Sequence, residues 1–182
     1  MPLTQIDAVP ALVLIDLQKG IINRPTAHPA TEIVNRAAQL AQAFRRRKFP
    51  VVLVNVDGPA PGRTQTAWPR QPRPADWAEL VPELNQAKDD ILITKRSWGA
   101  MINTPLHDIL QAKGVTQIFL GGIATSIGVE STAREAFALG YNVVLIHDAM
   151  TDLSDDNHRH SLDVVFPRLG ELTATAEVLQ RL

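Results

Sequence analysis

The chain has 182 residues, a length typical of one domain, and we predict a single domain over residues 1–182. Its 18 basic and 19 acidic side chains give a formal net charge of −1, so it lacks the excess of Lys and Arg that nucleic-acid binding needs. It contains no cysteine, which excludes disulfides, thiolate metal sites and cysteine catalysis.

The first residues contain no basic region followed by an apolar core and a small-residue cleavage site, so they do not predict a secretory signal. No apolar run approaches the roughly 18–20 residues that span a bilayer. We therefore expect a cytoplasmic protein with neither a membrane nor a nucleic acid as its partner.

Short aliphatic runs alternate along the chain with segments of helical periodicity. The aliphatic runs predict buried strands at residues 11–15, 50–56, 91–94, 117–120, 143–147 and 172–173. The periodic segments predict helices at residues 31–48, 105–113, 127–139, 156–168 and 176–182, the first with Thr31 as its N-cap. Residues 57–90 are rich in proline and predict a long loop with one helical turn near residues 77–84. This alternation predicts a three-layer α/β/α fold, with helices on both faces of a mostly parallel sheet of about six strands.

Polar residues follow the predicted strands, at the edge where ligands of open parallel sheets bind. They are Asp16 after the first strand, Asn55 in the second, Lys95 after the third, a glycine-rich turn after the fourth and His147-Asp148 after the fifth. Asp16 ends an aliphatic strand, where a carboxylate loses hydration and needs a partner. Lys95 beside it would hold that carboxylate at a useful pKa. The alternatives are an Asp16 that only caps the next turn and a Lys95 whose ammonium lies in water.

The glycine-rich turn, in GGIATSIGVESTAREA (residues 121–136), lies between the fourth strand and a predicted helix. A helix start of this kind offers free backbone N–H groups to a developing negative charge. The turn contains neither the GxGxxG of dinucleotide-binding folds nor the Gly-Lys-Ser/Thr of a P-loop. It therefore predicts an anion or oxyanion site without a nucleotide.

The same turn allows an alternative, a serine hydrolase. Its ATSIG segment approximates the GxSxG motif, with Ser126 as the nucleophile and Asp148 and His158 or His160 as partners. Against this alternative, Ala124 replaces the first glycine of the motif, and the histidines fall in a polar helix start.

The chain resembles the isochorismatase-like (cysteine hydrolase) superfamily in ALVLIDLQKG, ILITKRSWGAMINTPLHDIL, FLGGIATSIGVESTAREAFALGYNVVLIHDAMTD and HRHSLDVVFPRLGELTATAEVL. The resemblance covers almost everything except the proline-rich loop. It implies a Rossmann-like topology and assembly into homodimers or homotetramers. It also implies a catalytic Asp, Lys and Cys, which fall on Asp16, Lys95 and position 128, and a cis peptide between Ile123 and Ala124 in the oxyanion-forming turn.

Position 128 departs from the family pattern because it is Gly128. In the amidase and nicotinamidase members the cysteine forms a thioester with the substrate acyl group, which glycine cannot do. The metal site of the nicotinamidases needs an Asp-x-His pair after the second strand, where this chain has Asp57-Gly58-Pro59. We therefore expect no metal and no other cofactor.

The resemblance extends to isochorismatases, which also carry glycine at this position and hydrolyse a vinyl ether without a covalent intermediate. It implies that Asp16 is the general acid, that Lys95 tunes Asp16 and binds a substrate carboxylate, and that Gly128 leaves space for the substrate. The candidate pocket residues are Asn55, Arg63, Trp68 and Trp98. The arginine could instead lie in water, and the tryptophans could instead pack in the core. The leading hypothesis is a metal-independent hydrolase of a small molecule, and the alternatives are the serine hydrolase and a non-catalytic binding or scaffolding protein.

Overall fold

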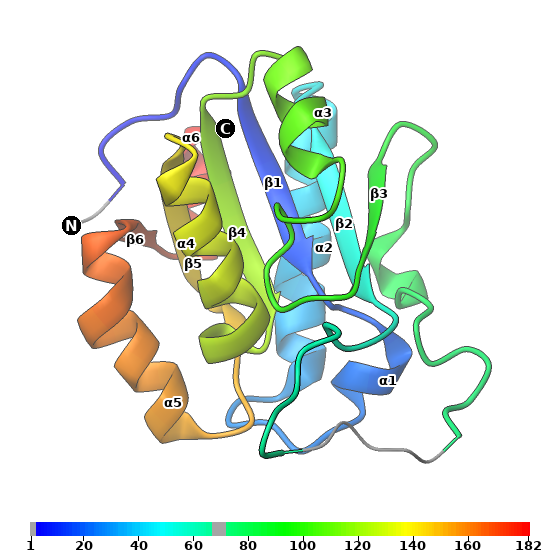
Figure 1. Ribbon diagram of the computed structural model, residues 1–182. Helices are drawn as coiled ribbons and strands as arrows, with labels where there is room; N and C mark the ends of the chain where they lie inside the picture. Colours follow the sequence, from blue (N-terminus) through cyan, green and yellow to red (C-terminus); the bar gives the residue numbers. More distant parts are fainter. Residues whose placement is uncertain (1–2, 67–71) are drawn as a thin grey trace.

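A parallel sheet forms the centre of the computed structural model, which describes residues 3–66 and 72–182 (Figure 1). Its six strands lie in the order β3-β2-β1-β4-β5-β6, and every pair of neighbours is parallel. They are β1 (Pro10–Ile15), β2 (Val51–Val56), β3 (Ile91–Lys95), β4 (Gln117–Ile123), β5 (Asn142–Thr151) and β6 (Gly170–Thr173). The strand order reverses between β1 and β4, so the carboxyl ends of these strands flank the crevice where ligands bind in such folds.

Helices cover both faces of the sheet (Figure 1). One face carries α2 (Ala30–Arg46) and α6 (Thr175–Arg181), and the other carries α3 (Leu106–Ala112) and α4 (Glu130–Ala138). The shorter α1 (Lys19–Ile22) and α5 (Asp155–His160) follow the carboxyl ends of β1 and β5. Short 3-10 and π-helical turns lie at Pro82–Leu84, Thr125–Val129, Ser161–Val165 and Phe166–Arg168.

The two apolar layers meet the central strand β1 on its opposite faces. Val13 and Ile15 pack in the layer beneath α3 and α4, whereas Leu12 and Leu14 pack in the layer beneath α2. All six residues of β1 are buried, because a central parallel strand is covered on both sides. This double burial explains why the strands read as continuous aliphatic runs in the sequence.

The predicted fold class is confirmed, and each predicted strand is present. The helices differ from expectation in some details. The short α1 occurs where no helix is predicted, and Pro29 rather than Thr31 is the N-cap of α2. The helices predicted at 127–139 and 156–168 each include a π-helical turn, which hydrophobic periodicity does not reveal.

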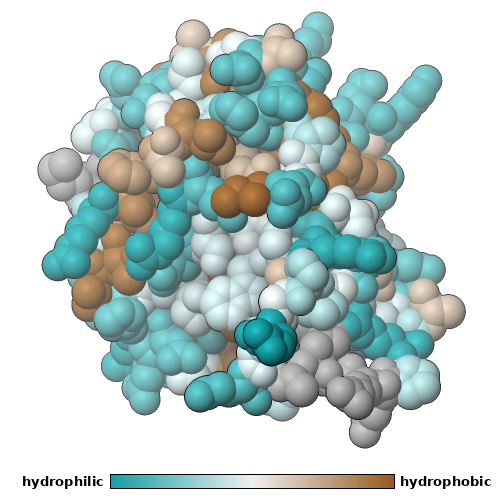
Figure 2. All heavy atoms as spheres, viewed as in Figure 1, coloured by the Kyte–Doolittle hydropathy of each residue, from teal (hydrophilic) through white to brown (hydrophobic). Residues whose placement is uncertain are grey.

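The face of the molecule that carries α3 and α4 is mostly hydrophilic (Figure 2). Apolar residues occur on it in separate spots. In the described part of the chain, the exposed large apolar side chains include Trp98, Ile102 and Phe137. Exposed apolar residues that are scattered singly are usual on a soluble surface. Among the described helices, none combines the length and the apolar character needed to cross a membrane.

Candidate active site

Asp16 and Lys95 meet at the carboxyl edge of the sheet. Asp16 follows β1 and Lys95 ends β3, and β2 lies between these strands, so the lysine side chain reaches across the end of β2. Lys95 Nζ donates hydrogen bonds to Asp16 Oδ2 at 2.9 Å and to the backbone carbonyl of Ser97 at 3.0 Å. Only 6% of Asp16 and 2% of Lys95 is exposed. The structure therefore brings the two predicted residues together as an ion pair shielded from water.

The backbone turns sharply at Asp16. Its φ of 54° lies in the left-handed region, which aspartate adopts more readily than most residues other than glycine. Its N–H still donates to the carbonyl of Val54 at 2.9 Å, and its own carbonyl accepts from the N–H of Gln18 at 2.9 Å. The carboxylate therefore belongs to a turn that begins while the chain is still paired with β2.

Gln18, which sequence reasoning missed, holds this turn in place. Its side chain is fully buried, donates to the carbonyl of Val56 at 3.0 Å and accepts from the Val56 N–H at 2.8 Å. It also donates to the carbonyl of Trp77 at 3.2 Å, in the long loop. A polar amide three residues beyond the end of an aliphatic strand was the available signal, because buried amides need several partners.

The charge state of Asp16 is set by opposing influences. Burial raises its pKa and the neighbouring Lys95 ammonium lowers it, which leaves the pKa at about 6. Asp16 Oδ1 has no hydrogen-bond partner, and no other buried side-chain polar atom in residues 3–66 and 72–182 shares this property. Buried polar atoms almost always have partners, so one without any suggests a catalytic or binding role. Near pH 6 this carboxyl group is often protonated, and one of its oxygens makes no hydrogen bond.

The turn between β4 and α4 lies against Asp16. Its Ile123–Ala124 peptide bond is cis, at the position that the resemblance implies. A Cβ atom added to the buried Gly128 would lie 3.2 Å from Asp16 Oδ2 and 2.8 Å from Ile15 Cγ2. A side chain at position 128 would therefore crowd the isoleucine and the carboxylate. The glycine instead allows the turn to approach the carboxylate closely.

Asp152 supports the other side of this turn and was also missed. It is buried, and its Oδ2 accepts a hydrogen bond from the Ser126 N–H at 2.7 Å. It directly follows β5, which extends to Thr151 rather than ending at the predicted residue 147. A carboxylate at a strand end was the available signal, but the predicted strand ended too early, at residue 147, to place Asp152 there.

The serine-hydrolase alternative is not favoured. His158 Nδ1 lies 2.8 Å from Thr125 Oγ1, so this ring nitrogen pairs with the residue before Ser126. Asp148 accepts two hydrogen bonds from the first residue of α6, both at 2.8 Å, and His160 is exposed. These residues therefore do not form a hydrogen-bonded Ser-His-Asp triad.

Three of the four expected pocket residues are described, and none of the three hydrogen-bonds to the ion pair. Asn55 Nδ2 donates to the backbone carbonyl of Ala78 at 2.7 Å, so its amide anchors the long loop. Arg63 is exposed, and Trp68 lies outside the described residues. The Trp98 residue is 63% exposed rather than in the core, but its backbone carbonyl lies 3.6 Å from the added Cβ position. Trp98 therefore borders the site through its backbone.

A pocket of about 380 Å³ is lined by residues at the ends of β2 and β3 and in the segments that follow them, but not by Asp16 or Lys95. Its lining includes Ser97, whose carbonyl accepts from Lys95, and an ion pair between Arg96 and Asp57 at 2.8 Å. Its volume is within the range of small-molecule sites. Within the described ranges, no group of three or more His, Asp or Glu side chains is arranged to hold a metal ion.

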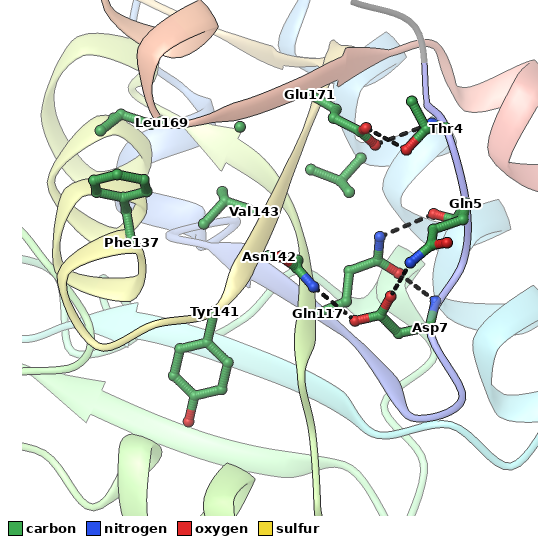
Figure 3. A pocket seen from close by; sticks show the side chains of 12 residues that line it. Thr4, Gln5, Asp7, Gln117, Phe137, Tyr141, Asn142, Val143, Leu169 and Glu171 are labelled. Atoms are coloured by element: carbon green, nitrogen blue, oxygen red, sulfur yellow. Dashed lines mark hydrogen bonds between the residues drawn. The ribbon is translucent and has the colours of Figure 1, made fainter.

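A second pocket, of about 210 Å³, lies at the opposite, amino edge of the sheet (Figure 3). Asp7 accepts hydrogen bonds there from Gln5 at 3.2 Å, Thr116 at 2.7 Å and Asn142 at 2.9 Å. Figure 3 shows hydrogen bonds that join Glu171 to Thr4, Gln117 to Gln5 and Asp7, and Asn142 to Asp7. They therefore fasten the N-terminal segment to the starts of β4, β5 and β6.

A sequence model of the isochorismatase domain matches residues 10–177. The chain is 44% identical over 178 residues to the isochorismatase family protein YwoC of Bacillus subtilis (strain 168), a match that covers 94% of this chain and 93% of the relative. It is 39% identical over 189 residues to the family protein YecD of Escherichia coli O157:H7, covering 94% and 95%. A solved isochorismatase family structure from Burkholderia thailandensis superimposes with a TM-score of 0.92 at 37% identity, covering 97% of this chain and 96% of that one. The chain therefore belongs to the isochorismatase family of hydrolases.

Proposed function

We propose that this hydrolase cleaves the vinyl ether of a small, isochorismate-type substrate, with Asp16 as the general acid and without a thioester intermediate. The observation that carries the proposal is the state of Asp16. Its carboxyl group is buried, has a pKa of about 6 and keeps Oδ1 free of partners, while Lys95 holds Oδ2. A carboxyl group with these properties is suited to delivering a proton near neutral pH.

The reaction would begin when protonated Asp16 transfers its proton to the methylene carbon of the enol-pyruvyl group. The double-bond electrons form the new C–H bond, which leaves an oxocarbenium ion at the ether carbon. Water adds to that carbon, and the resulting hemiketal breaks its C–O bond to release pyruvate and an alcohol. A proton from the attacking water returns to the Asp16 carboxylate, so the enzyme is unchanged.

Lys95 would act at two points of this sequence. Its ammonium is 2.9 Å from Asp16 Oδ2, so it stabilises the carboxylate that forms when the proton leaves. A positive charge at the site also favours a substrate that carries a carboxylate. Covalent acyl transfer to sulfur is not available, because the chain contains no cysteine and position 128 is glycine.

The test is to mix the purified protein with isochorismate and to measure pyruvate through lactate dehydrogenase and NADH absorbance. We expect pyruvate release well above the spontaneous rate, and we expect Asp16→Asn to abolish most of the excess. A wild-type protein that releases pyruvate no faster than buffer would overturn the isochorismate assignment. Wild-type activity that Asp16→Asn retains would overturn the acid role.

A further inference from the structure

The turn at Thr125–Val129 is held from one side by residues that follow β5. Asp152 Oδ2 accepts from the Ser126 N–H at 2.7 Å, and His158 Nδ1 lies 2.8 Å from the hydroxyl of Thr125. Thr125 is fully buried and His158 is 5% exposed. The histidine therefore makes a shielded side-chain contact with the first residue of the turn.

The opposite side of the same turn packs on Asp16. The Cβ position of Gly128 is 3.2 Å from Asp16 Oδ2, so the backbone of the turn covers the carboxylate directly. Burial is the largest influence on the pKa of Asp16. Any outward shift of the turn would admit water to the carboxylate.

His158 is suited to hold a buried turn because it is not forced to carry a charge there. Burial and the neighbouring His28 lower its pKa, and His147 adds to this, whereas Asp152 and Asp155 oppose it. The rings of His28 and His158 lie 4.9 Å apart. A neutral imidazole can bond to a hydroxyl group without introducing a net charge beside the site.

We propose that His158 is a positioning residue: through Thr125 it holds the turn at Thr125–Val129 against Asp16 and so keeps water away from that carboxylate. The assignment of Asp16 as a catalytic acid rests on the proposed function. The exclusion of water from Asp16 does not, so it can be tested without any substrate.

The main experiment is a titration of the Asp16 carboxyl carbon by ¹³C NMR in the folded protein. Thr125→Val keeps the shape of the side chain and removes the hydroxyl, and His158→Ala removes the ring. We expect both variants to lower the pKa of Asp16 from about 6 toward the ordinary range of an aspartate, because the carboxylate becomes hydrated.

Two matched variants distinguish positioning from general stability. In His158→Asn the amide stands near the place of Nδ1 and can still bond to Thr125, so we expect the Asp16 titration to stay close to wild type. His160→Ala changes an exposed residue of the same helix, and we expect no change. An Asp16 titration that is the same in folded Thr125→Val and His158→Ala as in wild type would overturn the proposal.

Turnover gives a second readout if isochorismate is a substrate. We expect kcat to fall about tenfold in Thr125→Val and KM to stay within about twofold, because the turn acts on the acid and not on substrate binding. His158→Asn should recover most of kcat. An unchanged kcat in Thr125→Val would contradict the proposal. A wild-type protein without turnover would reject only isochorismate as the substrate, because the NMR titration still tests the role of His158.

Discussion

Two aspartates at opposite edges of the sheet have opposite surroundings. Asp16 at the carboxyl edge is buried, has one ammonium partner and keeps Oδ1 without any partner. Asp7 at the amino edge accepts hydrogen bonds from three side chains. Burial raises the pKa of Asp7, but the bonds from Asn142, Thr116 and Gln5 outweigh it, so the net pKa is lowered. Burial dominates at Asp16, and its pKa rises to about 6.

The difference distinguishes a carboxylate that stabilises the fold from one that can transfer a proton to a ligand. A carboxylate with a full set of donors is held in its ionised form and stabilises the segments that supply the donors. A buried carboxylate with too few donors holds its proton more tightly and can give it to a ligand. The same residue type therefore has different roles at the two edges, and burial together with the number of donors decides which.

The largest effect is expected from Asp16→Asn. Removal of the acid should lower kcat/KM for isochorismate by about 10²–10⁴-fold, which is the usual contribution of a general acid. Pyruvate release measures it. The matched change at the other edge, Asp7→Asn, should keep turnover within about twofold. Similar losses in both variants would break the distinction between the two carboxylates.

The next largest effect is that of pH on turnover. Asp16 must carry a proton to act as the acid, and its pKa is about 6. We expect kcat/KM to be nearly constant below that pH and to fall about tenfold for each pH unit above it. A pH–rate series measures this, and Asp7→Asn should leave the profile in place. A rate that rises above pH 6 would assign the activity to the carboxylate form instead.

Gly128→Ala tests the close approach of the turn. The added methyl group would lie 2.8 Å from Ile15 Cγ2 and 3.2 Å from Asp16 Oδ2, so it must displace the carboxylate or the turn. Because the shorter of these contacts is with Ile15, the isoleucine must also shift, and we expect about a tenfold loss of kcat and a decrease of about 1–3 kcal/mol in the free energy of unfolding. Urea unfolding and pyruvate release measure the two effects. Gly62→Ala is the control, because nothing lies within 4 Å of its added methyl group.

The smallest expected effect is on the pH dependence of the free energy of unfolding. Its sign is opposite for Asp16 and for Asp7. The raised pKa of Asp16 means that its contribution to stability is full below the ordinary aspartate pKa and is lost as the pH rises through about 6. The lowered pKa of Asp7 gives the reverse, a contribution present above the ordinary pKa and lost on acidification. We compare urea unfolding of Asp16→Asn at about pH 4 and about pH 7, and that of Asp7→Asn at about pH 2.5 and about pH 5, because the two contributions change in these ranges. Relative to wild type, Asp16→Asn should gain stability as the pH rises and Asp7→Asn should lose it; equal trends would refute the contrast.

Much of the fold could be predicted because its signals are local. Aliphatic runs such as residues 11–15 identify strands that are buried on both faces, and the alternation with helices identifies a parallel sheet. The same logic predicted that Asp16 and Lys95 would lie at one edge. It could not show that the lysine crosses the end of β2, because strand order is a property of long-range pairing.

The parts of the site that could not be predicted depend on contacts between distant segments. Nothing in the turn sequence shows that His158 pairs with Thr125, or that Ile15 and Asp16 fill the space beside Gly128. Glycine can make room for a substrate or for a neighbouring segment, and only the packing shows which segments lie against it.

The attachment of the long loop has a consequence for how such a hydrolase can change its substrate. Gln18 donates to the carbonyl of Trp77, Asn55 donates to that of Ala78, and Lys19 forms an ion pair with Glu79 at 2.6 Å. These contacts fasten the returning end of the loop next to the acid. These contacts do not involve the chain between β2 and this attachment. That part of the loop can therefore be lengthened, shortened or exchanged while Asp16 keeps its surroundings.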